Sequence, residues 1–326
     1  MAGRHLKELF RAFRTHDELA FRRAALEIIE EEQGKHHTAL ARDLRSLLAA
    51  GNGSVVDSGA YAILPEPPTD REGNWPLAQV RRPGYSLSDL VINQAASSAI
   101  EGLITESRRW TDLDHYGLPR QQRILFQGPP GCGKTSAAEA LATELGRPFI
   151  IVSIDAVVSS YLGETASNLR RIFDYADQAP FIVLFDEFDA LGRNRDDSSE
   201  HGEIKRVVTT FLQMLDKYSG PSILIAATNH PGLLDRALWR RFDEVLDFTK
   251  PTVHELRQVI RLRLRAMPHA GVGIDQYAAA LKGYPHAAAE KLAIDAQRSA
   301  VINDRREIGT ADMDQALARV TARRWE

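Results

Sequence analysis

The stretch Gly128-Pro129-Pro130-Gly131-Cys132-Gly133-Lys134-Thr135 decides the fold of this chain. It matches the pattern G-x-x-x-x-G-K-[ST], which cradles phosphate groups. An apolar run at residues 124–126 precedes it and predicts a buried strand, and residues 136–142 after it predict a helix. Because glycine lets the backbone bend sharply, successive N–H groups of such a loop point at phosphate oxygens. The order strand, loop, helix therefore predicts a nucleotide-binding α/β fold.

Three features of this loop predict how it holds a nucleotide. Lys134 places a positive charge at the β- and γ-phosphates, and the Thr135 hydroxyl is a ligand for Mg²⁺. The helix that begins near Ser136 adds the partial positive charge of its N-terminus. A glycine-rich turn that binds nothing is the alternative, and the full match in its strand and helix context argues against it. We expect residues 128–136 to contact ATP, with Mg²⁺ as its companion ion.

The composition excludes several other classes of protein. The 326 residues are 44% hydrophobic and 26% charged, as in ordinary globular proteins, and suffice for about two domains. The net charge of −3 gives no electrostatic case for nucleic acid as the main partner. The single cysteine, Cys132, excludes a disulfide within the chain and fits a reducing compartment. Without a membrane-spanning run or a signal peptide, the chain is expected to be cytoplasmic, with no membrane partner.

Hydrophobic periodicity divides the chain into four parts. Residues 1–50 carry helical spacing and predict a short N-terminal helical bundle, and residues 51–83, rich in glycine and proline, predict a linker. Residues 84–250 alternate strands and helices, which is typical of a parallel sheet with helices on both faces. Residues 251–326 predict a helical lid domain of four helices. Within the α/β part we expect strands at 124–126, 149–154, 181–185 and 222–227, and helices at 87–109, 136–145, 166–177 and 201–217.

A second set of polar residues follows two of the predicted strands. Asp186 and Glu187 end the apolar run at residues 181–185, and Asn229 follows the next strand. In an open parallel sheet these strand ends lie beside the phosphate loop. Asp186 is therefore expected to hold Mg²⁺ through its water shell, and Glu187 to act as the general base that polarises the attacking water. Asn229 can orient that water; a strand ending in two solvated acids is the alternative.

With these pieces in order, residues 84–321 resemble the AAA family of ATPases. Residues 186–191 (DEFDAL) resemble the D-E-x-D-A stretch of the family, and residues 227–229 (ATN) are similar to its sensor-1 element. Residues 234–243 (LDRALWRRFD) are similar to L-D-x-A-L-x-R…R-F-D, which carries the arginine fingers. Asp89-Leu90-Val91 resembles the D-I-G segment that holds the adenine. The resemblance implies a homo-oligomeric ring, usually a hexamer, with ATP bound between neighbouring subunits.

The resemblance makes Arg240 and Arg241 the candidates for arginine fingers that act on the nucleotide of a neighbouring subunit. A guanidinium delivered to the γ-phosphate stabilises transition-state charge and is worth roughly 10³–10⁵ in rate. Many relatives separate the two arginines by Pro-Gly, whereas here they are adjacent. Either both reach the phosphate or one pairs with a carboxylate at the interface. Surface arginines without such a role are the alternative.

The lid departs from the family pattern. Arg263 stands where relatives often place a histidine near the nucleotide. Pro285-His286-Ala287-Ala288 matches the family's Ser-Gly-Ala-Asp only loosely, and the resemblance implies that His286 or Ala287 lies near the adenine or ribose. An obvious sensor-2 arginine is absent from the sequence, which fits AAA proteins in the narrow sense.

Tyr161-Leu162-Gly163 is similar to the aromatic–apolar–glycine pore loop with which AAA translocases grip an extended polypeptide. An aromatic ring offers apolar contact to many sequences, and Gly163 permits movement of the loop. Residues 193–203, polar and glycine-containing, resemble the second pore loop. The alternatives are a tyrosine packed under a loop and an ordinary solvated loop.

These features predict an ATP-driven remodeller or unfoldase of protein substrates, which residues 1–50 would recruit. Two alternatives stay open: an ATPase that remodels DNA, and a regulatory switch whose hydrolysis gates a partner. The layout of a short helical N-terminus and one ATPase module also resembles bacterial AAA proteins that act beside subtilisin-like serine proteases in plasmid stability and phage defence. That resemblance makes such a protease a candidate partner and antiviral defence a candidate role.

Overall fold

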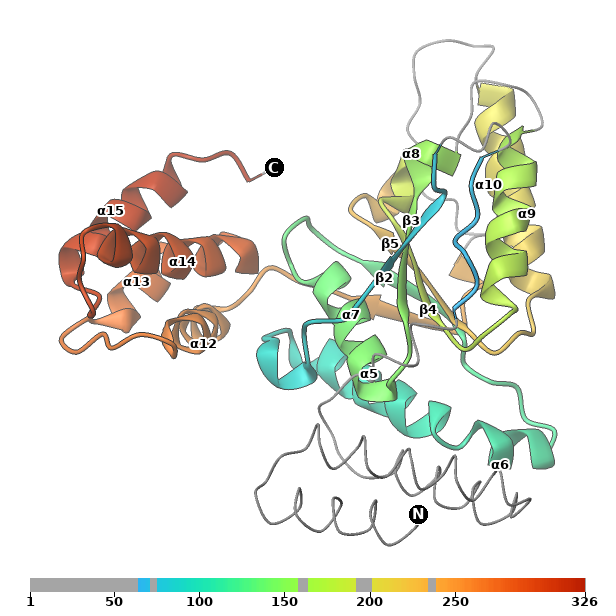
Figure 1. Cartoon of the computed structure of the whole chain (residues 1–326), viewed down its shortest axis with the longest axis horizontal. Coiled ribbons are helices and arrows are strands. Elements are labelled where there is room, and N and C mark those ends of the chain that lie inside the picture. Colours follow the sequence, from blue (N-terminus) through green and yellow to red (C-terminus); the bar gives the residue numbers. More distant parts are fainter. Residues whose placement is uncertain (1–63, 71–74, 158–163, 192–200, 234–238, 326) are drawn as a thin grey trace, which may run out of the picture. The chain divides into compact units, whose positions relative to one another are not determined.

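The computed structural model describes residues 64–70, 75–157, 164–191, 201–233 and 239–325 (Figure 1). All of them belong to the second of the two units into which the chain divides, Gly59–Glu326. The predicted N-terminal helices and the candidate pore loop Tyr161-Leu162-Gly163 lie outside the described residues, as does most of the second pore-loop candidate. Among the described helices, none is long and apolar enough to cross a membrane.

A six-stranded sheet forms the centre of the α/β part. Five of its strands are parallel, and the edge strand β1 runs antiparallel to its neighbour β3. The apolar strands are buried on both faces, as a parallel sheet between two helix layers requires. In their order across the sheet, the strands are β1 (Ala78–Arg81), β3 (Phe149–Ser153), β4 (Ile182–Asp186), β5 (Ile223–Thr228), β2 (Arg123–Gln127) and β6 (Glu244–Asp247).

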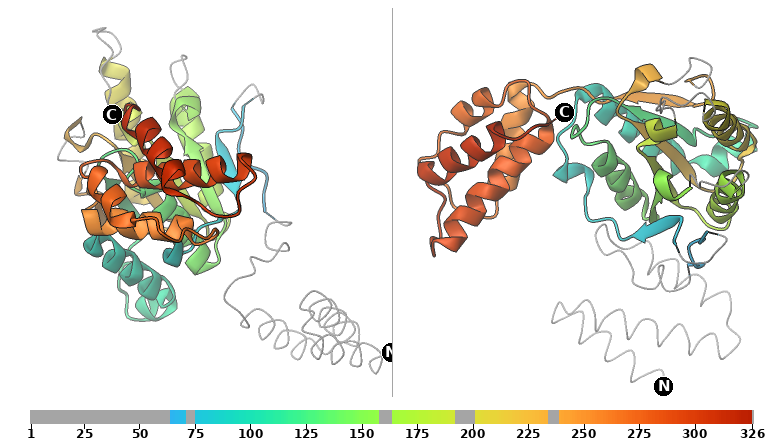
Figure 2. Two further views of the ribbon diagram at one scale, coloured as in Figure 1. Left: turned by 90° about the vertical axis from the view of Figure 1, so that its left-hand side faces the viewer. Right: turned by 90° about the horizontal axis from the view of Figure 1, so that it is seen from above.

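Helices cover both faces of this sheet (Figure 2). Successive strand residues point to opposite faces, so Leu125 joins one core cluster while Ile124 and Phe126 join the other. Phe173 and Phe211 cover the first face, and Leu141 lies on the second. The helices of this part are α5 (Gln94–Ser107), α6 (Trp110–His115), α7 (Lys134–Leu145), α8 (Ile154–Val157), α9 (Glu164–Ala176) and α10 (His201–Lys217).

The last part of the chain is helical and has its own hydrophobic core. Thr252 and Glu255 form a capping box at its first helix, because each side chain accepts a hydrogen bond from the backbone N–H of the other. Leu256 and Ile260 lie on one face of that helix and pack against Leu292 and other residues of the core cluster. The four helices are α12 (Val253–Leu264), α13 (Ile274–Ala280), α14 (His286–Ile302) and α15 (Thr310–Thr321).

The register of the sheet places three functional segments side by side. Gln127 pairs with Thr228, and Phe185 pairs with Ala226, so β4, β5 and β2 end at the same edge of the sheet. The phosphate loop, Glu187 and Asn229 each follow one of these three strand ends. The fold therefore confirms the predicted parallel sheet with helices on both faces and the helical C-terminal part, and it brings the predicted active-site segments together.

The structure differs from the expected elements at three places. Strand β1 lies within the predicted linker, where its pairing with β3 supplies the order that periodicity did not reveal. The helix expected at residues 87–109 begins only at Gln94, because Asn93 caps it by accepting a hydrogen bond from the Ala96 N–H at 2.9 Å. Residues 87–89 form a separate 3₁₀ turn instead. Strand β6, short and half polar, was also missed.

Candidate active site

The phosphate loop needs its glycines for conformational reasons that the structure makes explicit. Gly128 has a φ of 138°, and a Cβ atom there would run into the carbonyl of Phe248, the residue that follows β6. Gly133 has a φ of 95° and stands directly before α7, where the loop turns into the helix. L-residues rarely adopt these angles, so only glycine permits this path. The N-terminus of α7 thereby faces the concave side of the loop.

Lys134 lies inside this loop with only 6% of its surface exposed. Its ammonium group donates hydrogen bonds to the carbonyls of Gly128 at 2.7 Å and Pro129 at 2.9 Å, and to the Asn229 side-chain oxygen at 2.7 Å. Burial lowers the pKa of Lys134, because desolvation disfavours the charged ammonium. Among the residues that the structure describes, these neutral acceptors are the direct partners of the Lys134 ammonium and no carboxylate pairs with it, which suits the loop to an anionic phosphate.

Thr135 and Asp186 come together as predicted from the two motifs. The Thr135 hydroxyl donates to the Asp186 carboxylate at 2.9 Å, although the two residues lie in α7 and at the end of β4. A hydroxyl and a carboxylate are hard oxygen ligands of the kind that Mg²⁺ prefers, directly or through water. The pair fits a magnesium ion that also binds phosphate oxygens.

Glu187 directly follows β4 and is exposed, as a residue that meets a water molecule must be. Its φ of 51° lies in the left-handed region, which is uncommon outside glycine. The Glu187 N–H donates to the carboxylate of Asp186 at 2.9 Å, so the Asp186 side chain holds this backbone turn. Such strain costs about 1 kcal/mol and is often found at functional sites.

The buried carboxylate of Asp189 holds the backbone at Asn229 in place. Asp189 is 1% exposed, and its carboxylate accepts hydrogen bonds from the Asn229 N–H at 3.0 Å and the Thr228 hydroxyl at 3.3 Å. The D-E-x-D spacing was the signal that could have identified it, because it places a third acid two residues after Glu187. The Asn229 side chain contacts Lys134 here, whereas we expected it to orient water beside Glu187.

The expected adenine segment contacts both the α/β part and the helical lid. Asp89 accepts hydrogen bonds from the Ser86 hydroxyl at 2.7 Å and from Arg265 of the lid at 2.9 Å. The Ser86 hydroxyl is the first reason that the pKa of Asp89 is lowered. Val91 packs against the hydrophobic core of the lid. Through these hydrogen bonds Asp89 fixes the start of the segment. Leu90 and Val91 continue the chain toward α5.

The lid contacts the phosphate loop through the start of α14. The Ala287 N–H donates to the Gly131 carbonyl at 3.0 Å, which places this helix end on the phosphate loop. His286 is 8% exposed, and neither ring nitrogen has a hydrogen-bond partner among the described residues. Burial lowers its pKa, so the imidazole is held neutral.

Arg263 stands at the position of the family's histidine, and its side chain contacts an aromatic ring and a carboxylate. Its guanidinium lies over the ring of Tyr85, 5.3 Å from the ring centroid, and pairs with Glu290 at 3.1 Å. Tyr85 lies shortly before the adenine segment, on the other side of residues 86–88, so Arg263 joins the lid to the stretch that leads into that segment. A cation–π contact of this kind contributes about 0.5–1 kcal/mol.

The two candidate finger arginines lie away from the phosphate loop of their own subunit. They precede β6, whose first residue, Glu244, pairs with Ile124 near the start of β2, whereas the loop follows the other end of β2. Arg241 pairs with Asp216 of α10. Arg240 is exposed, and within the described residues no hydrogen bond or ion pair holds its side chain. Residues 234–238 of the same motif lie outside the described part.

The parallel sheet, the glycine-rich loop that buries a lysine and the acidic end of β4 define a P-loop nucleotide-binding protein. Comparison with known proteins gives the family. The family model described as "ATPase family associated with various cellular activities (AAA)" matches residues 124–250. The AAA family ATPase y4kL of Sinorhizobium fredii is 39% identical over 324 residues, 99% of this chain and 96% of the relative. The chain therefore belongs to the AAA family of ATPases.

Two further relatives show what kinds of protein share this module. A proteasome-activating nucleotidase of Pyrococcus horikoshii is 29% identical over 85% of this chain and 71% of its own length. The ATP-dependent zinc metalloprotease FtsH 3 of Sphaerobacter thermophilus is 33% identical over 85% of this chain, which spans 58% of that protein. Membership of the family and the phosphate loop together support ATP binding and hydrolysis.

Proposed function

We propose that this chain hydrolyses ATP with the help of Mg²⁺ in a ring of identical subunits, and that the ring unfolds or remodels protein substrates. The observation that carries the proposal is a division of the catalytic groups. Lys134, Asp186 and Glu187 lie at the carboxyl ends of the parallel strands. Arg240 lies near the amino end of β2, on the opposite side of the sheet.

The half of the site within one subunit supplies binding and base catalysis. Lys134 exchanges its carbonyl partners for phosphate oxygens, and Thr135 and Asp186 hold the magnesium ion. Magnesium, when bound, neutralises charge on the phosphates. Glu187 accepts a proton from the water that attacks the γ-phosphate, and ADP and phosphate are the products. Asn229, released from Lys134, is free to orient that water.

In this proposal a neighbouring subunit supplies a further cation to the γ-phosphate. The five residues of β2, at about 3.3 Å each, separate the amino and carboxyl ends of the strand by about 16 Å. An arginine side chain does not reach that far. Arg240 therefore serves the nucleotide of the adjacent subunit, and Arg241, held by Asp216, supports the interface. A closed ring satisfies every subunit in the same way, because each gives one finger and receives one.

Protein is the proposed substrate because of the relatives and of the candidate pore loop. A proteasome-activating nucleotidase and an ATP-dependent protease are both similar to this chain over 85% of its length. Tyr161-Leu162-Gly163 would contact the substrate in the ring's pore. The variant Tyr161→Ala separates threading from the alternative of a regulatory switch: a threading ring loses substrate remodelling and keeps basal hydrolysis, whereas a switch keeps both. Hydrolysis that DNA stimulates in a salt-sensitive way would instead favour DNA remodelling.

The direct test of the proposed function uses Glu187→Gln, with Lys134→Ala as its matched control. Glu187→Gln is expected to bind ATP, to assemble with ATP into a larger particle and to retain protein substrate, because only the base is lost. Lys134→Ala is expected to bind no ATP and to stay unassembled. Light scattering after size exclusion measures the assembly, and mass spectrometry after a pull-down identifies the retained proteins. Failure of Glu187→Gln to assemble with ATP would contradict the ring.

The pairing with a subtilisin-like serine protease extends this proposal. The y4kL relative matches 99% of this chain, so the N-terminal segment and the ATPase module occur together in that protein too. Co-purification of a serine protease with the native chain would support the pairing and a role in defence. Recovery of the assembled ring without any such protease would argue against both.

A further inference from the structure

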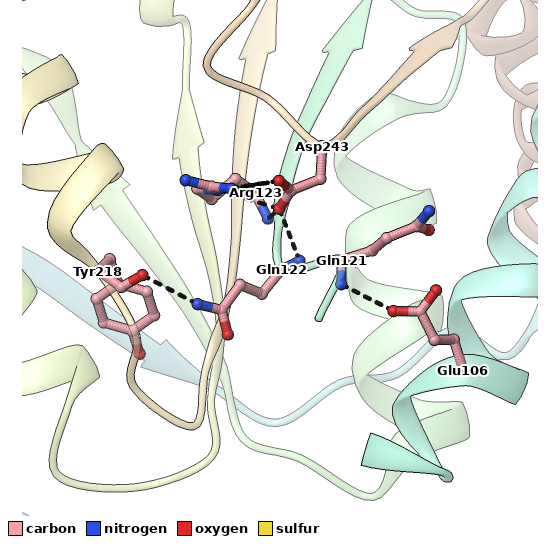
Figure 3. Close-up of polar contacts among 6 residues, drawn as sticks. All are labelled: Glu106, Gln121, Gln122, Arg123, Tyr218 and Asp243. Carbon is pink, nitrogen blue, oxygen red and sulfur yellow. Dashed lines mark hydrogen bonds and ion pairs between the residues drawn. The ribbon is translucent and has the colours of Figure 1, made fainter. Parts of the chain in front are cut away.

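Three residues form a tight polar cluster where β2 begins; we call it the entry clamp: Gln122, Arg123 and Asp243 (Figure 3). The Asp243 carboxylate accepts hydrogen bonds from the backbone N–H groups of Gln122 at 3.1 Å and Arg123 at 2.9 Å. It also binds the Arg123 guanidinium through Nε at 3.1 Å and through Nη2. The Asp243 N–H donates in return to the Arg123 carbonyl at 2.7 Å.

The geometry of the entry clamp makes it a rigid joint. The Arg123 and Asp243 side chains are only 26% and 17% exposed, so water competes little for their contacts. Hydrogen bonding to Asp243 is the main reason that the pKa of Arg123 is raised, and the guanidinium therefore stays charged. A guanidinium and a carboxylate that share two hydrogen bonds also fix each other's orientation.

The joint is anchored to the body of the subunit by its neighbours (Figure 3). The Gln122 side chain donates to the Tyr218 carbonyl at 3.1 Å, just beyond the end of α10. The Gln121 N–H donates to the Glu106 carboxylate of α5 at 2.7 Å. Helices on both faces of the sheet thus hold the start of β2 in place.

The segment that the entry clamp fixes is the one that carries Arg240. Asp243 follows the two arginines after a single residue, Phe242, which is buried in the core cluster. Trp239, on the other side of the arginines, packs against the same cluster, and the Phe242 N–H donates to its carbonyl at 3.4 Å. Arg240 is therefore an exposed side chain on a short turn that is anchored on both sides.

We infer that Asp243 is a positioning residue for hydrolysis in the neighbouring subunit: through the entry clamp it aims Arg240 at that subunit's nucleotide. The inference rests on the proposed function, because it needs a finger that acts across the interface. A catalytic group displaced by about 1 Å loses roughly 10² in rate. An anchored turn prevents that displacement, and the anchor is the strand that leads to the subunit's own phosphate loop.

The test mixes two kinds of full-length subunit. Receivers carry Arg240→Ala and keep a complete nucleotide site, whereas donors carry Glu187→Gln and keep a complete finger. ATP hydrolysis then occurs only where a donor's finger meets a receiver's site. Asp243→Asn is introduced either into the donor or into the receiver, and the hydrolysis rate of each mixture is measured at saturating ATP.

A positioning role predicts an asymmetric result. Asp243→Asn in the donor is expected to lower the rate by roughly 10- to 100-fold, whereas the same change in the receiver leaves the rate unchanged within error. Equal losses in both placements would mean that Asp243 serves only the fold, and the absence of a loss in the donor would mean that the finger does not depend on it. Either result overturns the inference.

Two controls keep the outcome interpretable. If Asp243→Asn does not fold, Arg123→Gln is introduced into the donor and, separately, into the receiver; it removes the side-chain half of the clamp and is expected to give a smaller loss, again in the donor only. The starting mixture, without any change at Asp243, must hydrolyse ATP faster than either subunit alone. If it does not, the shared site of the proposed function fails, and this inference is overturned with it.

Discussion

The two ends of strand β2 are held in opposite ways. At its carboxyl end, Lys134 rests on backbone carbonyls and an amide oxygen that a phosphate group can replace. At its amino end, the carboxylate of Asp243 is saturated by groups of the same chain. The difference reflects two tasks. The Lys134 side chain has hydrogen-bond partners that a ligand can replace, whereas the Asp243 side chain has partners within the fold that stay in place.

The largest expected effect comes from a substitution at the carboxyl end of β2. Gly128→Ala places a Cβ atom against the Phe248 carbonyl at a φ of 138° that alanine rarely adopts. We expect a loss of about 3 kcal/mol in the free energy of unfolding, together with loss of ATP binding. Urea unfolding and titration with a fluorescent ATP analogue measure the two effects.

Gly102→Ala is the matched control for this variant. Gly102 lies in α5, and a Cβ atom there has nothing within 4 Å. Alanine is the better helix former, so this change is expected to raise the free energy of unfolding by up to about 1 kcal/mol. If Gly128→Ala bound ATP as the unchanged chain does, our account of the loop would be wrong.

The second effect concerns the amino end, where the two partners of the entry clamp are not equivalent. Asp243→Ala leaves the partly buried Arg123 guanidinium and two strand N–H groups without their acceptor, which is expected to cost about 3 kcal/mol of folding free energy. Arg123→Met leaves Asp243 with both backbone donors and is expected to cost about 1 kcal/mol. Urea unfolding measures both, and equal costs would contradict the proposed role of the carboxylate.

The third effect tests the lid above the phosphate loop through its pH dependence. Burial lowers the pKa of His286 in the folded chain below the ordinary 6.5. Below pH 6.5 the unfolded chain therefore binds more protons, so stability is complete above this pH and falls as the pH falls toward the lowered value. The slope is at most about 1.4 kcal/mol per pH unit.

His286→Gln is expected to remove this part of the slope in thermal unfolding measured across that pH range without nucleotide. His115→Gln is the control, because His115 is exposed on α6 and outside the site. A slope that persists in His286→Gln would show that another group is responsible.

The smallest effect concerns backbone strain at Glu187, the proposed catalytic base. Glu187→Asn and Glu187→Gln both remove the carboxylate and should both abolish hydrolysis. Asparagine tolerates the left-handed conformation better than glutamine, so Glu187→Asn is expected to be more stable by about 0.5 kcal/mol. Chemical unfolding of the two variants side by side measures the difference. Equal stability would mean that the left-handed backbone at Glu187 does not strain the fold.

The parts of the site that follow strands were predictable from sequence. The loop at residues 128–135, the acids at 186–187 and Asn229 each come directly after an apolar run, and parallel strands end at a common edge. The lid helices follow from their periodicity and from the capping pair Thr252 and Glu255. The family resemblance singled out Arg240 and Arg241 and the start of α14, although the contact of Ala287 with the Gly131 carbonyl was not part of that expectation.

The parts that depend on distant partners were not predictable. Arg123 and Asp243 lie 120 residues apart, and nothing in either local sequence announces their pairing. Strand β1 lacks a periodic pattern of its own and is ordered by β3. Which of the two arginines is paired was also open; the contact of Arg241 with Asp216 is a tertiary one. Local patterns specify elements, whereas the anchoring of a turn needs the fold.

The central claim is that the active site is shared between subunits, and the most direct test is the mixture of Arg240→Ala and Glu187→Gln subunits. Each variant alone is expected to be nearly inactive, because removing the finger costs roughly 10³–10⁵ in rate and removing the base stops hydrolysis. Mixed at equal amounts with ATP and Mg²⁺, they are expected to regain hydrolysis at receiver sites that meet a donor finger. A mixture no faster than the sum of its two components would contradict the account.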